Sequence, residues 1–477
     1  MRYISTRGQA PPVSFLDAML AGLAPDGGLY VPESWPALKT SPRMIVRMHY
    51  SGVALRVLEA FAGADVASEE AIVDAVNEAY IDAPRDPLDS SWRGKWPETV
   101  TPLRQVRVAD WLLELFHGPS LSFKDVAMQL IGPLYDFALA KRDARLSVVC
   151  ATSGDTGGAA VEALKGREHV DLFVLTPKGR VSDVQRRFMT TSGAANVHAI
   201  EVDGDFDACQ SIVKGLFADR DFAERAQLSG VNSINWARIV AQSVYYQIAA
   251  HTLSAHGPVD FVVPTGNFGD AYSGWVAKRM GAPVGRIVLA TNANDILVRA
   301  LDTGRYERGA SRATLSPAMD IQVASNFERI LFEALERDGA AVGRLYAQLA
   351  QSDGFDIPPS ALERLRADFS AAEVDDGATL QTMAWAAQDD APICPHTAVG
   401  YAARSKVTQE LSGGPVVFLA TAHPAKFPDT LERATGVRPP LPAKCADLFE
   451  RSEKFDSLPA DAEAVKTYIR ERSRAWS

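Results

Sequence analysis

Residues 146–158 have the sequence LSVVCATSGDTGG, and this stretch decides the fold. Its first part, residues 146–151, is a short apolar run of the kind that forms a strand buried on both faces. Residues 152–158 are small and polar and predict a tight turn, after which a helical pattern begins. A buried strand, a turn and a helix form the repeating unit of a parallel sheet that is covered by helices.

Further apolar runs repeat this arrangement along the chain. They are residues 171–176, 197–202, 260–264 and 286–290, with a late run at 415–421. Between the early and the late runs, residues 235–256 have apolar side chains at helical spacing, and we expect this long helix to connect two sheet regions. The pattern predicts an α/β protein built on parallel strands.

The regions on either side of these runs differ from them. In the first hundred residues, turns at 11–12 and 26–28 precede expected helices at 44–62 and 69–80, so we expect a separate helical cap. Residues 320–412 are expected to be mostly helical, with interruptions at 358–359 and 389–392. We therefore expect an N-terminal domain over 1–95, a catalytic region with a large and a small α/β domain over 96–440, and a helical C-terminal extension over 441–477.

Composition narrows the class of protein. The chain has 477 residues and a formal net charge of −10, without a local basic cluster, so no nucleic-acid partner is expected. The four cysteines are scattered and the eight histidines show no ligand spacing, which argues against a disulfide framework and a metal site. No apolar run approaches the roughly 20 residues of a membrane span, and no signal peptide is evident. We expect a cytoplasmic protein with no membrane partner.

Lys124 is the first candidate for chemistry. It lies in residues 117–125, HGPSLSFKD, between an expected strand end and a long helix. A lysine attacks an aldehyde only when its amine is neutral, and the free side chain has a pKa of about 10.4. Partial desolvation or an existing Schiff base meets this requirement, and pyridoxal phosphate is the cofactor that uses a lysine in this way. An exposed lysine near a helix start is the simpler alternative, and the motif alone does not decide between them.

A glycine-rich loop at residues 263–270, VPTGNFGD, is a candidate anion site. Gly266 and Gly269 allow the backbone to approach an oxyanion at the start of a helix. The loop lacks both the P-loop pattern and the G-x-G-x-x-G spacing, which favours a compact phosphate monoester over a nucleotide. The alternative is an ordinary turn in which Asn267 or Asp270 is the helix N-cap.

The turn at residues 151–158 is the second candidate loop, because its hydroxyl and N–H groups suit a substrate carboxylate. Asp155 would repel an anion, so we expect it either to cap the helix or to face a polar edge of a cofactor. A cap with small residues for close packing is an equally good explanation of this loop. Together, Lys124 and the two loops predict a ligand site at three neighbouring strand ends of an open sheet.

Three other places in the sequence have simpler explanations than a role in chemistry. Cys394 and His396 lie close together, but a helix start after Pro395 explains them better than a nucleophile and its base. Thr421 ends an apolar strand, where its hydroxyl could meet a pyridine nitrogen, although a β-branched strand residue is the simpler interpretation. Residues 326–329 could direct an arginine at a second phosphate, but a solvated helix start is simpler.

At this point the motifs resemble those of the threonine synthase family, the pyridoxal-phosphate enzymes related to tryptophan synthase β. The resemblance covers nearly the whole chain. It rests on residues 3–8, 22–29, 117–125, 153–157, 266–269, 395–398 and 421–426. Asp155 stands where the wider group has asparagine. Cys394 stands where an acidic residue is expected, which puts only the local helix cap in doubt.

The resemblance implies a fold-type II enzyme with two open, mostly parallel sheets flanked by helices, plus an N-terminal helical domain. It implies that the enzyme converts O-phospho-L-homoserine and water to L-threonine and phosphate, by γ-elimination and β-addition of water. The alternative is a phospho-lyase or a serine/threonine dehydratase of the same fold. The protein would be a monomer or a homodimer.

The resemblance also implies roles for individual residues. Lys124 would be the catalytic residue and would carry the cofactor pyridoxal 5′-phosphate as a Schiff base. The other cofactor-binding residues would be Asp155, Gly266, Asn267, Phe268, Gly269, Asp270 and Thr421, with Thr421 at the pyridine nitrogen. The substrate-binding residues would be Ser153, Thr156, Asn326 and Arg329. Candidates to hold the substrate phosphate are Arg329, Lys278 and Arg238.

Overall fold

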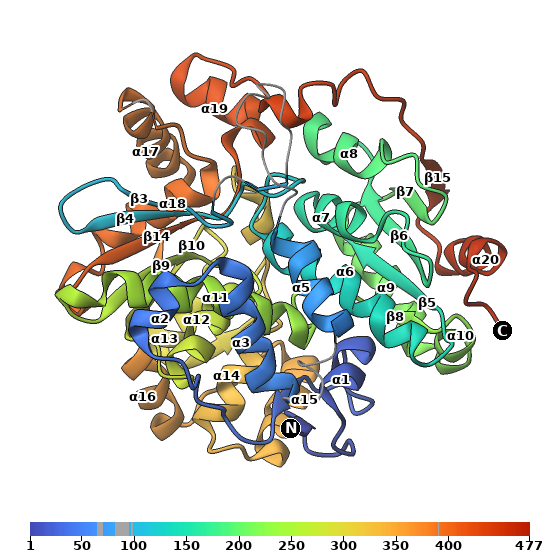
Figure 1. Cartoon of the computed structure of the whole chain (residues 1–477), viewed down its shortest axis with the longest axis horizontal. Helices are drawn as coiled ribbons and strands as arrows, with labels where there is room; N and C mark the ends of the chain where they lie inside the picture. Colours follow the sequence, from blue (N-terminus) through green and yellow to red (C-terminus); the bar gives the residue numbers. More distant parts are fainter. Residues whose placement is uncertain (64–69, 82–94, 97–98, 390) are drawn as a thin grey trace.

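The structure is a computed structural model that describes residues 1–63, 70–81, 95–96, 99–389 and 391–477. Two open sheets stand apart, with helices between them and on their outer faces (Figure 1). The larger sheet has the order β13-β10-β9-β14-β4-β3, and the smaller sheet has the order β15-β7-β6-β5-β8. Neighbouring strands are parallel in both sheets, except for the antiparallel pair β3 and β4. The predicted pair of mostly parallel sheets is confirmed.

The strands have the following bounds. The larger sheet contains β3 (Leu103–Gln105), β4 (Asp110–Glu114), β9 (Val259–Pro264), β10 (Val284–Thr291), β13 (Phe369–Glu373) and β14 (Val416–Ala420). The smaller sheet contains β5 (Leu146–Ala151), β6 (Val170–Pro177), β7 (Val197–Asp203), β8 (Leu228–Ser229) and β15 (Asp456–Pro459). Two short pairs lie outside these sheets: β1 (Tyr3–Ser5) with β2 (Tyr30–Pro32), and β11 (Arg305–Glu307) with β12 (Gly354–Asp356). Each predicted apolar run is a strand.

The helices surround the sheets. Those in the first half of the chain are α1 (Phe15–Ala21), α2 (Pro42–Arg47), α3 (Tyr50–Ala62), α5 (Glu70–Tyr80), α6 (Lys124–Ala140), α7 (Asp155–Leu164), α8 (Asp183–Thr190), α9 (Phe206–Ala218) and α10 (Arg220–Arg225). Those in the second half are α11 (Trp236–Leu253), α12 (Gly269–Arg279), α13 (Ile296–Thr303), α14 (Phe327–Ala334), α15 (Gly339–Ser352), α16 (Pro359–Asp368), α17 (Asp376–Gln388), α18 (Pro395–Arg404), α19 (Pro428–Thr435) and α20 (Ala462–Arg472).

Helices α6 and α11 form the central layer between the two sheets (Figure 1). Helix α6 packs against α7 of the smaller sheet and against α11, and α11 packs against α12 of the larger sheet. Both central helices are buried on nearly all sides, as their mainly apolar sequences require. The expected helix at 235–256 is therefore present and connects the two sheet regions.

The N-terminal region packs on this central layer. Its helices α2 and α3 contact α11, and its apolar side chains belong to the same hydrophobic cluster as those of α6, α11 and α12. The single helix expected at 44–62 is wrong, because the backbone is extended at Met48 and His49 and divides it into α2 and α3. Both short helices lie against α11.

Two segments expected to be helical also contain strands. Within residues 320–412, β13 pairs with β10 at the edge of the larger sheet, and β12 pairs with β11. The sequence of β13, FSAAE, has few residues that favour strands, so its pairing with β10 determines its structure. In the C-terminal segment over 441–477, β15 extends the smaller sheet beside β7, and α20 packs on α9.

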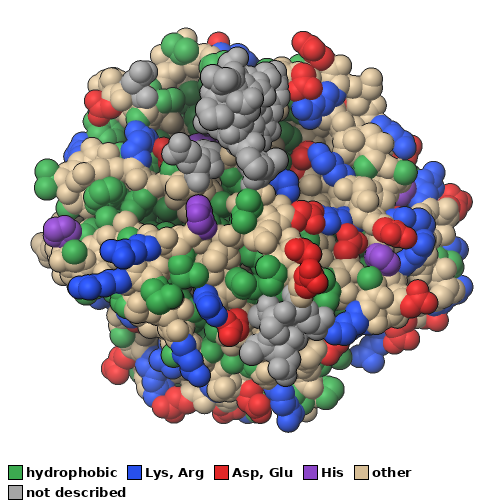
Figure 2. Space-filling view, viewed as in Figure 1, with side chains coloured by type: hydrophobic (Ala, Val, Ile, Leu, Met, Phe, Trp, Pro, Cys, Tyr) green, Lys and Arg blue, Asp and Glu red, His purple; other side chains and the backbone are tan. Residues whose placement is uncertain are grey.

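The surface is mixed in charge. On the face shown in Figure 2, Lys and Arg side chains are interspersed with those of Asp and Glu. Across the described ranges, no helix combines the length and apolar character that a bilayer crossing needs.

Trp236, at the start of α11, anchors the N-terminal region. Its buried indole contacts the rings of Tyr3, Trp35 and Phe61 at centroid distances of 5.8, 6.2 and 5.6 Å. We expect Trp236→Ala to lower the free energy of unfolding by about 3–5 kcal/mol, because it leaves a large cavity where these segments meet. Urea denaturation measures this change.

The control for Trp236→Ala is Trp385→Ala, which removes a half-buried indole on α17 that contacts Tyr401 and Arg107. We expect it to cost only about 1 kcal/mol. Equal losses in the two variants would show that the N-terminal region does not depend on Trp236.

Candidate active site

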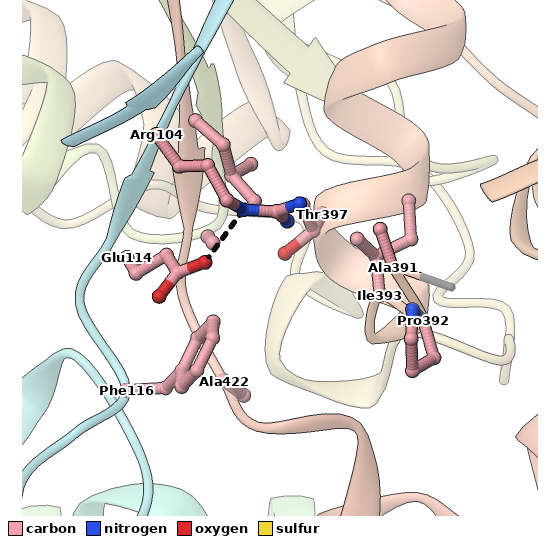
Figure 3. A pocket seen from close by; sticks show the side chains of 10 residues that line it. Arg104, Glu114, Phe116, Ala391, Pro392, Ile393, Thr397 and Ala422 are labelled. Carbon is pink, nitrogen blue, oxygen red and sulfur yellow. Dashed lines mark hydrogen bonds and ion pairs between the residues drawn. The ribbon is translucent and has the colours of Figure 1, made fainter. Parts of the chain in front are cut away.

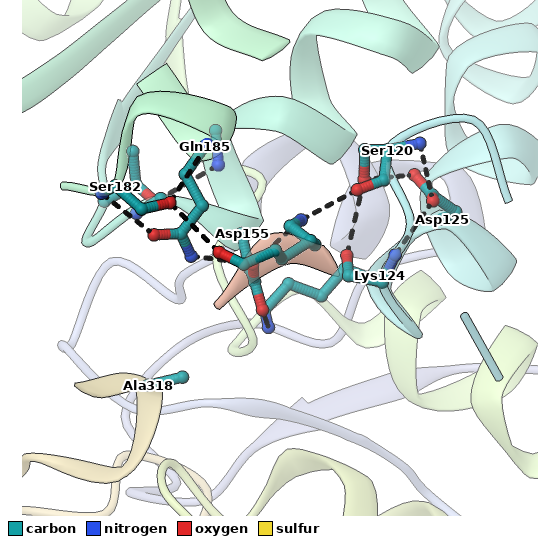
Figure 4. Close-up of polar contacts among 12 residues, drawn as sticks. Ser120, Lys124, Asp125, Asp155, Ser182, Gln185 and Ala318 are labelled. Carbon is teal, nitrogen blue, oxygen red and sulfur yellow. Dashed lines mark hydrogen bonds and ion pairs between the residues drawn. The ribbon is translucent and has the colours of Figure 1, made fainter. Parts of the chain in front are cut away.

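Lys124 is the first residue of α6 and lies between the two sheets. Its side chain is buried, and its Nζ is 3.5 Å from Oδ2 of Asp155 and 4.4 Å from the ring centroid of Phe123 (Figure 4). Burial lowers the pKa of Lys124 and outweighs the opposing effect of Asp155, while the nearby cations Arg238 and Lys426 lower it further. The desolvated amine expected from the sequence is therefore present, and an exposed lysine is excluded.

The loop before Lys124 is folded around the carboxylate of Asp125. This carboxylate accepts hydrogen bonds from the backbone N–H of Ser120 at 2.9 Å, the Ser120 hydroxyl at 2.7 Å and the backbone N–H of Ser122 at 3.3 Å. Gly118 must be glycine here, because a Cβ would lie 2.2 Å from Cβ of Asp125. The motif at 117–125 thus fixes the position of Lys124.

Thr421 lies next to this loop. It follows the last residue of β14, is buried, and its carbonyl oxygen accepts a hydrogen bond from the N–H of Phe123 at 2.8 Å. Residues Ser122 and Ala422 also form a β-bridge. The structure therefore brings Thr421 and Lys124 together, although 296 intervening positions separate them in the printed sequence.

Asp155 occupies the first turn of α7 but does not cap it. The N-cap residue is Gly154, and the hydroxyl of Thr152 accepts hydrogen bonds from the N–H groups of Gly154 and Gly157 at 2.9 and 3.1 Å. The capping alternative for Asp155 is wrong, because its carboxylate turns toward Lys124 instead. Sequence analysis missed Thr152, whose hydroxyl is the local acceptor.

The carboxylate of Asp155 is surrounded by donors. Its Oδ1 is 2.8 Å from Nζ of Lys426 and accepts a hydrogen bond from Nε2 of Gln185 at 2.9 Å (Figure 4). Burial acts to raise the pKa of Asp155, but the Lys426 and Lys124 ammonium groups hold it well below its usual range. Asp155 is therefore ionised. Ser153 and Thr156, on either side in the sequence, are half-buried at the same end of α7.

The loop between β9 and α12 has the form of an anion site. Phe268 is the N-cap of α12 in the left-handed conformation with φ of 64°, and no side chain caps this helix. The alternative in which Asn267 or Asp270 caps the helix is therefore wrong. A Cβ on Gly266 would lie 2.5 Å from the carbonyl oxygen of Ala318, so this loop passes directly beneath another backbone segment.

Asn267 and Asp270, in the same loop, already have hydrogen-bond partners. The exposed Asn267 accepts hydrogen bonds at its carbonyl from the N–H and the Nδ2 of Asn326, at 3.0 and 3.1 Å. The carboxylate of Asp270 accepts hydrogen bonds from the hydroxyls of Tyr245 and Tyr246 on α11, and burial raises its pKa to about 6. Asp270 can thus offer an anion its backbone N–H, not its carboxylate.

Arg329 is fully buried, and its guanidinium already donates hydrogen bonds to protein acceptors. Its Nε donates to the carbonyl of Tyr30 at 3.0 Å, Nη2 to the carbonyl of Ile234 at 2.6 Å, and Nη1 to Oδ1 of Asn326. The solvated helix start expected at 326–329 is wrong, because acceptors from three separate segments converge on this guanidinium. Lys278 also has protein partners: its Nζ donates to the carbonyl of Gly285 at 3.0 Å and pairs with the carboxylate of Asp368 at 2.9 Å.

Arg238, near the start of α11, is the remaining basic candidate. It is buried, Nη1 donates to the carbonyl of Val231 at 3.1 Å, and its Nε has no hydrogen-bond partner among the described residues. Burial lowers its pKa to about 10. The nearby carboxyl group of Asp270 acts to raise this pKa. A buried donor without a partner is costly, so the Nε of Arg238 is suited to an anionic ligand.

The site lies between the sheets, not at three neighbouring strand ends of one sheet. Lys124 follows β4, and the glycine-rich loop at 263–270 follows β9. Strand β14 lies between β4 and β9 in the larger sheet. The turn before α7 follows β5 of the smaller sheet. The expectation of adjacent strands is wrong because apolar runs indicate buried strands but do not reveal which sheet each one joins.

The first turn of α18 completes the surroundings of Lys124 and Asp155. Cys394 is the N-cap, and its Sγ accepts a hydrogen bond from the N–H of Thr397 at 3.4 Å, which confirms the expected helix start. His396 is buried, its Nε2 accepts a hydrogen bond from the N–H of Ala318 at 3.3 Å, and burial lowers its pKa to about 4. The cysteine at the unexpected position therefore caps the helix adequately.

A cavity of about 230 Å³ lies beside the end of β14 (Figure 3). Ala420 and Ala422, on either side of Thr421, line it, together with Thr397 and an ion pair between Arg104 and Glu114 at 3.0 Å. Lys124, Asp155 and Arg238 are not among its lining residues. This cavity is therefore a neighbour of the Lys124 site and not the site itself.

Two parallel sheets with a buried lysine between them, opposite an uncapped glycine-rich loop, define a pyridoxal-phosphate-dependent enzyme of fold type II. A family model described as "Pyridoxal-phosphate dependent enzyme" matches residues 97–348. Two further models, "Threonine synthase N terminus" and "Threonine synthase, C-terminal", match residues 2–80 and 397–469. The chain belongs to the threonine synthase family.

Known proteins agree with this assignment. The chain is 44% identical to the threonine synthase of Pseudomonas aeruginosa, with 98% of each chain covered, and 35% identical to that of Saccharomyces cerevisiae, with 98% and 97% covered. Its structure matches a crystal structure of pyridoxal-phosphate-bound threonine synthase from Brucella melitensis with a TM-score of 0.92, 48% identity and full coverage of both chains. The yeast threonine synthase structure matches with a TM-score of 0.88 and 34% identity, over 99% and 98% of the chains.

The cofactor is pyridoxal 5′-phosphate, and the site fits it. The buried amine of Lys124 has the lowered pKa that Schiff-base formation needs. The uncapped first turn of α12 and the absence of a side chain at Gly266 suit its phosphate.

We expect Gly266→Ala to weaken cofactor affinity on the order of 10- to 100-fold, because the new Cβ would force the Ala318 backbone away from the loop and disturb the bound phosphate. Equilibrium dialysis against pyridoxal phosphate measures the affinity. Gly343→Ala in α15 is the control, since its Cβ would meet no atom within 4 Å. Unchanged affinity in Gly266→Ala would refute the phosphate role of this loop.

Proposed function

We propose that the protein converts O-phospho-L-homoserine and water to L-threonine and phosphate. The observation that carries this proposal is the joint burial, in one site, of the Lys124 amine with its lowered pKa and of the Arg238 guanidinium, whose Nε has no partner among the described residues. The amine of Lys124 suits a pyridoxal-phosphate reaction. The guanidinium of Arg238 suits a substrate that carries an anionic group of its own, in addition to the phosphate of the cofactor. The relatives' names agree with this activity.

The bound cofactor would withdraw electrons from carbons next to the substrate nitrogen. The residues that would hold it are Lys124, the loop at 266–269 and Thr421. The start of α12 would supply backbone N–H groups for the phosphate, and Thr421 would supply a hydroxyl for the ring nitrogen. A hydroxyl, unlike a carboxylate, does not hold that nitrogen strongly protonated, which favours elimination and water addition over racemisation.

Lys124 would be the base of the reaction. Its amine is buried and has a lowered pKa, so that the free amine could accept a proton from a substrate carbon. The carboxylate of Asp155, 3.5 Å away, stabilises the ammonium group that results. Lys124 could then return this proton to the substrate.

Arg238 would hold the phosphate of the substrate. Among the basic candidates, Arg329 and Lys278 already donate to protein acceptors, whereas the Nε of Arg238 has no partner among the described residues. Ser153 and Thr156, at the start of α7, would hold the substrate carboxylate. The side chain of Asn326 already donates to backbone carbonyls, so its role would be to shape the phosphate loop.

A lyase or dehydratase of the same fold is the second candidate function, and product analysis separates the two. With O-phospho-L-homoserine, we expect phosphate and threonine in equal amounts. Phosphate released with ammonia and 2-oxobutanoate would instead establish the lyase. Borohydride reduction followed by peptide mapping should place the pyridoxyl group on Lys124, and an adduct at another lysine would refute its role.

Arg238→Met tests the substrate-phosphate role. We expect KM for O-phospho-L-homoserine to rise on the order of 10- to 100-fold, because a charge-assisted contact worth about 1.5–3 kcal/mol is lost. Cofactor affinity should stay close to that of the unchanged protein. If cofactor affinity fell and KM did not change, Arg238 would belong to the cofactor phosphate.

Arg329→Met is the matched control for Arg238→Met, since both remove a buried guanidinium. We expect Arg329→Met to lower the free energy of unfolding by about 3 kcal/mol, because it leaves buried acceptors without donors. Arg238→Met should cost much less, because that guanidinium satisfies only one protein acceptor in the described structure.

A further inference from the structure

Lys426 is a fully buried cation near Lys124. It ends the short helix η4 (Pro424–Lys426), and its side chain is 1% exposed. Its Nζ lies 2.8 Å from Oδ1 of Asp155 and donates to the carbonyl of Ser120 at 2.7 Å. The reaction steps described for Lys124 and Arg238 give this second lysine no role.

The position of Lys426 connects the elements that carry the site. Ser120 belongs to the loop that leads to Lys124, and Asp155 belongs to α7 of the smaller sheet. The backbone carbonyl of Lys426 accepts a hydrogen bond from the hydroxyl of Ser182 at 3.1 Å, and Ser182 caps α8. Lys426 therefore joins the end of β14 in the larger sheet to two helices of the smaller sheet.

The two oxygens of Asp155 have different partners. Oδ1 is held by Lys426 and by Nε2 of Gln185 at 2.8 and 2.9 Å, whereas Oδ2 faces Lys124 at 3.5 Å. Because two donors fix Oδ1, the carboxylate cannot rotate freely, and Oδ2 stays directed at the reactive amine. A buried ion pair contributes little net stability after desolvation, so stability alone does not account for its presence here.

We propose that Lys426 is a positioning residue that holds the carboxylate of Asp155 against the amine of Lys124. This inference rests on the proposed function, in which Lys124 changes its charge during each turnover. Asp155 must remain ionised when Lys124 is neutral or bonded to the cofactor, and Lys426 supplies the counter-charge throughout. Without Lys426, a lone buried carboxylate would become protonated and would no longer stabilise the ammonium form of Lys124.

The charges around Lys426 fix the direction of the expected effect. The titratable groups that face it are Lys124 and Asp125 on α6, Asp155 on α7, His396 on α18, and His423 and Cys445. Removing the ammonium group takes a like charge away from Lys124 and the main counter-charge away from Asp155. The pKa of Asp155 should therefore rise. Because Asp155 raises the pKa of Lys124 more than Lys426 lowers it, the loss of the Asp155 charge should lower the pKa of Lys124.

Lys426→Met tests the inference in the full-length enzyme with its cofactor. Without substrate, we expect the pH at which the absorption of the bound cofactor changes to fall by about one unit or more, since the protonated Lys124 nitrogen loses the stabilising charge of Asp155. With substrate, we expect kcat to fall on the order of 10- to 100-fold at pH 7, KM to change little, and the acidic limb of the pH profile to move upward. Lys426→Arg should recover part of both effects.

Lys278→Met is the matched control. Lys278 also pairs with one aspartate and one backbone carbonyl, Asp368 and Gly285, but at the C-terminal end of α12 and at a more exposed position. We expect it to change neither the cofactor titration nor kcat. Thermal unfolding of all variants shows whether each is folded, and Lys426→Arg carries the test if Lys426→Met is not.

A double-mutant cycle with Asp155→Asn separates positioning from packing. If Lys426 acts through Asp155, adding Lys426→Met to Asp155→Asn should lower kcat by less than about twofold further. Additive losses, or folded Lys426 variants with an unchanged cofactor titration and kcat, would overturn the inference. The cofactor titration needs no substrate, so a failure of the proposed reaction would appear only in the product analysis of the unchanged enzyme.

Discussion

The burial of the Lys124 amine beside an ionised carboxylate is the interaction on which the rest of the site depends. Burial lowers the pKa of the Lys124 amine, and the nearby carboxylate of Asp155 raises it. Because these two effects oppose each other, the amine can both donate and accept a proton. That balance requires Asp155 to keep its own charge in the same dry surroundings. Two buried cations on either side of the carboxylate meet this requirement.

The two-sheet architecture is what makes such a site possible. Strands of the larger sheet deliver Thr421 and the loop at 266–269, and the smaller sheet delivers Asp155 through α7. Helix α6 starts between them, so the amine of Lys124 is enclosed by elements from both sheets. A single sheet would leave one side of this amine open to water, and its pKa would be nearer to that of a free lysine.

The sequence predicted the strands well because buried parallel strands are continuous apolar runs, and 146–151 matches β5 residue for residue. It also predicted a desolvated amine at Lys124, which the burial of this side chain confirms. It did not predict β13, whose weak strand propensity is overridden by its neighbour β10. It also did not show that the strands leading to the site belong to two different sheets. The sheet that a strand joins depends on contacts between segments that are distant in sequence.

Buried charges were the hardest residues to predict. Lys426 is distant in sequence from both Ser120 and Asp155, and nothing next to it in the sequence signals that its ammonium group is buried. The capping pattern of Ser182 and Gln185 was visible in principle, but it predicts a helix start and not a contact with Asp155. Such contacts are set by tertiary packing, which local sequence patterns do not encode.

Two buried arginines, Arg329 and Arg238, differ in how many protein acceptors their guanidinium groups contact. Arg329 donates to acceptors from three segments, so its charge is balanced by the protein. Arg238 is buried to a similar degree but satisfies only the carbonyl of Val231 among the described residues. A buried donor without a partner is costly, and the Nε of Arg238 is such a donor among the described residues. This is the reason for our proposal that Arg238 holds the phosphate of the substrate.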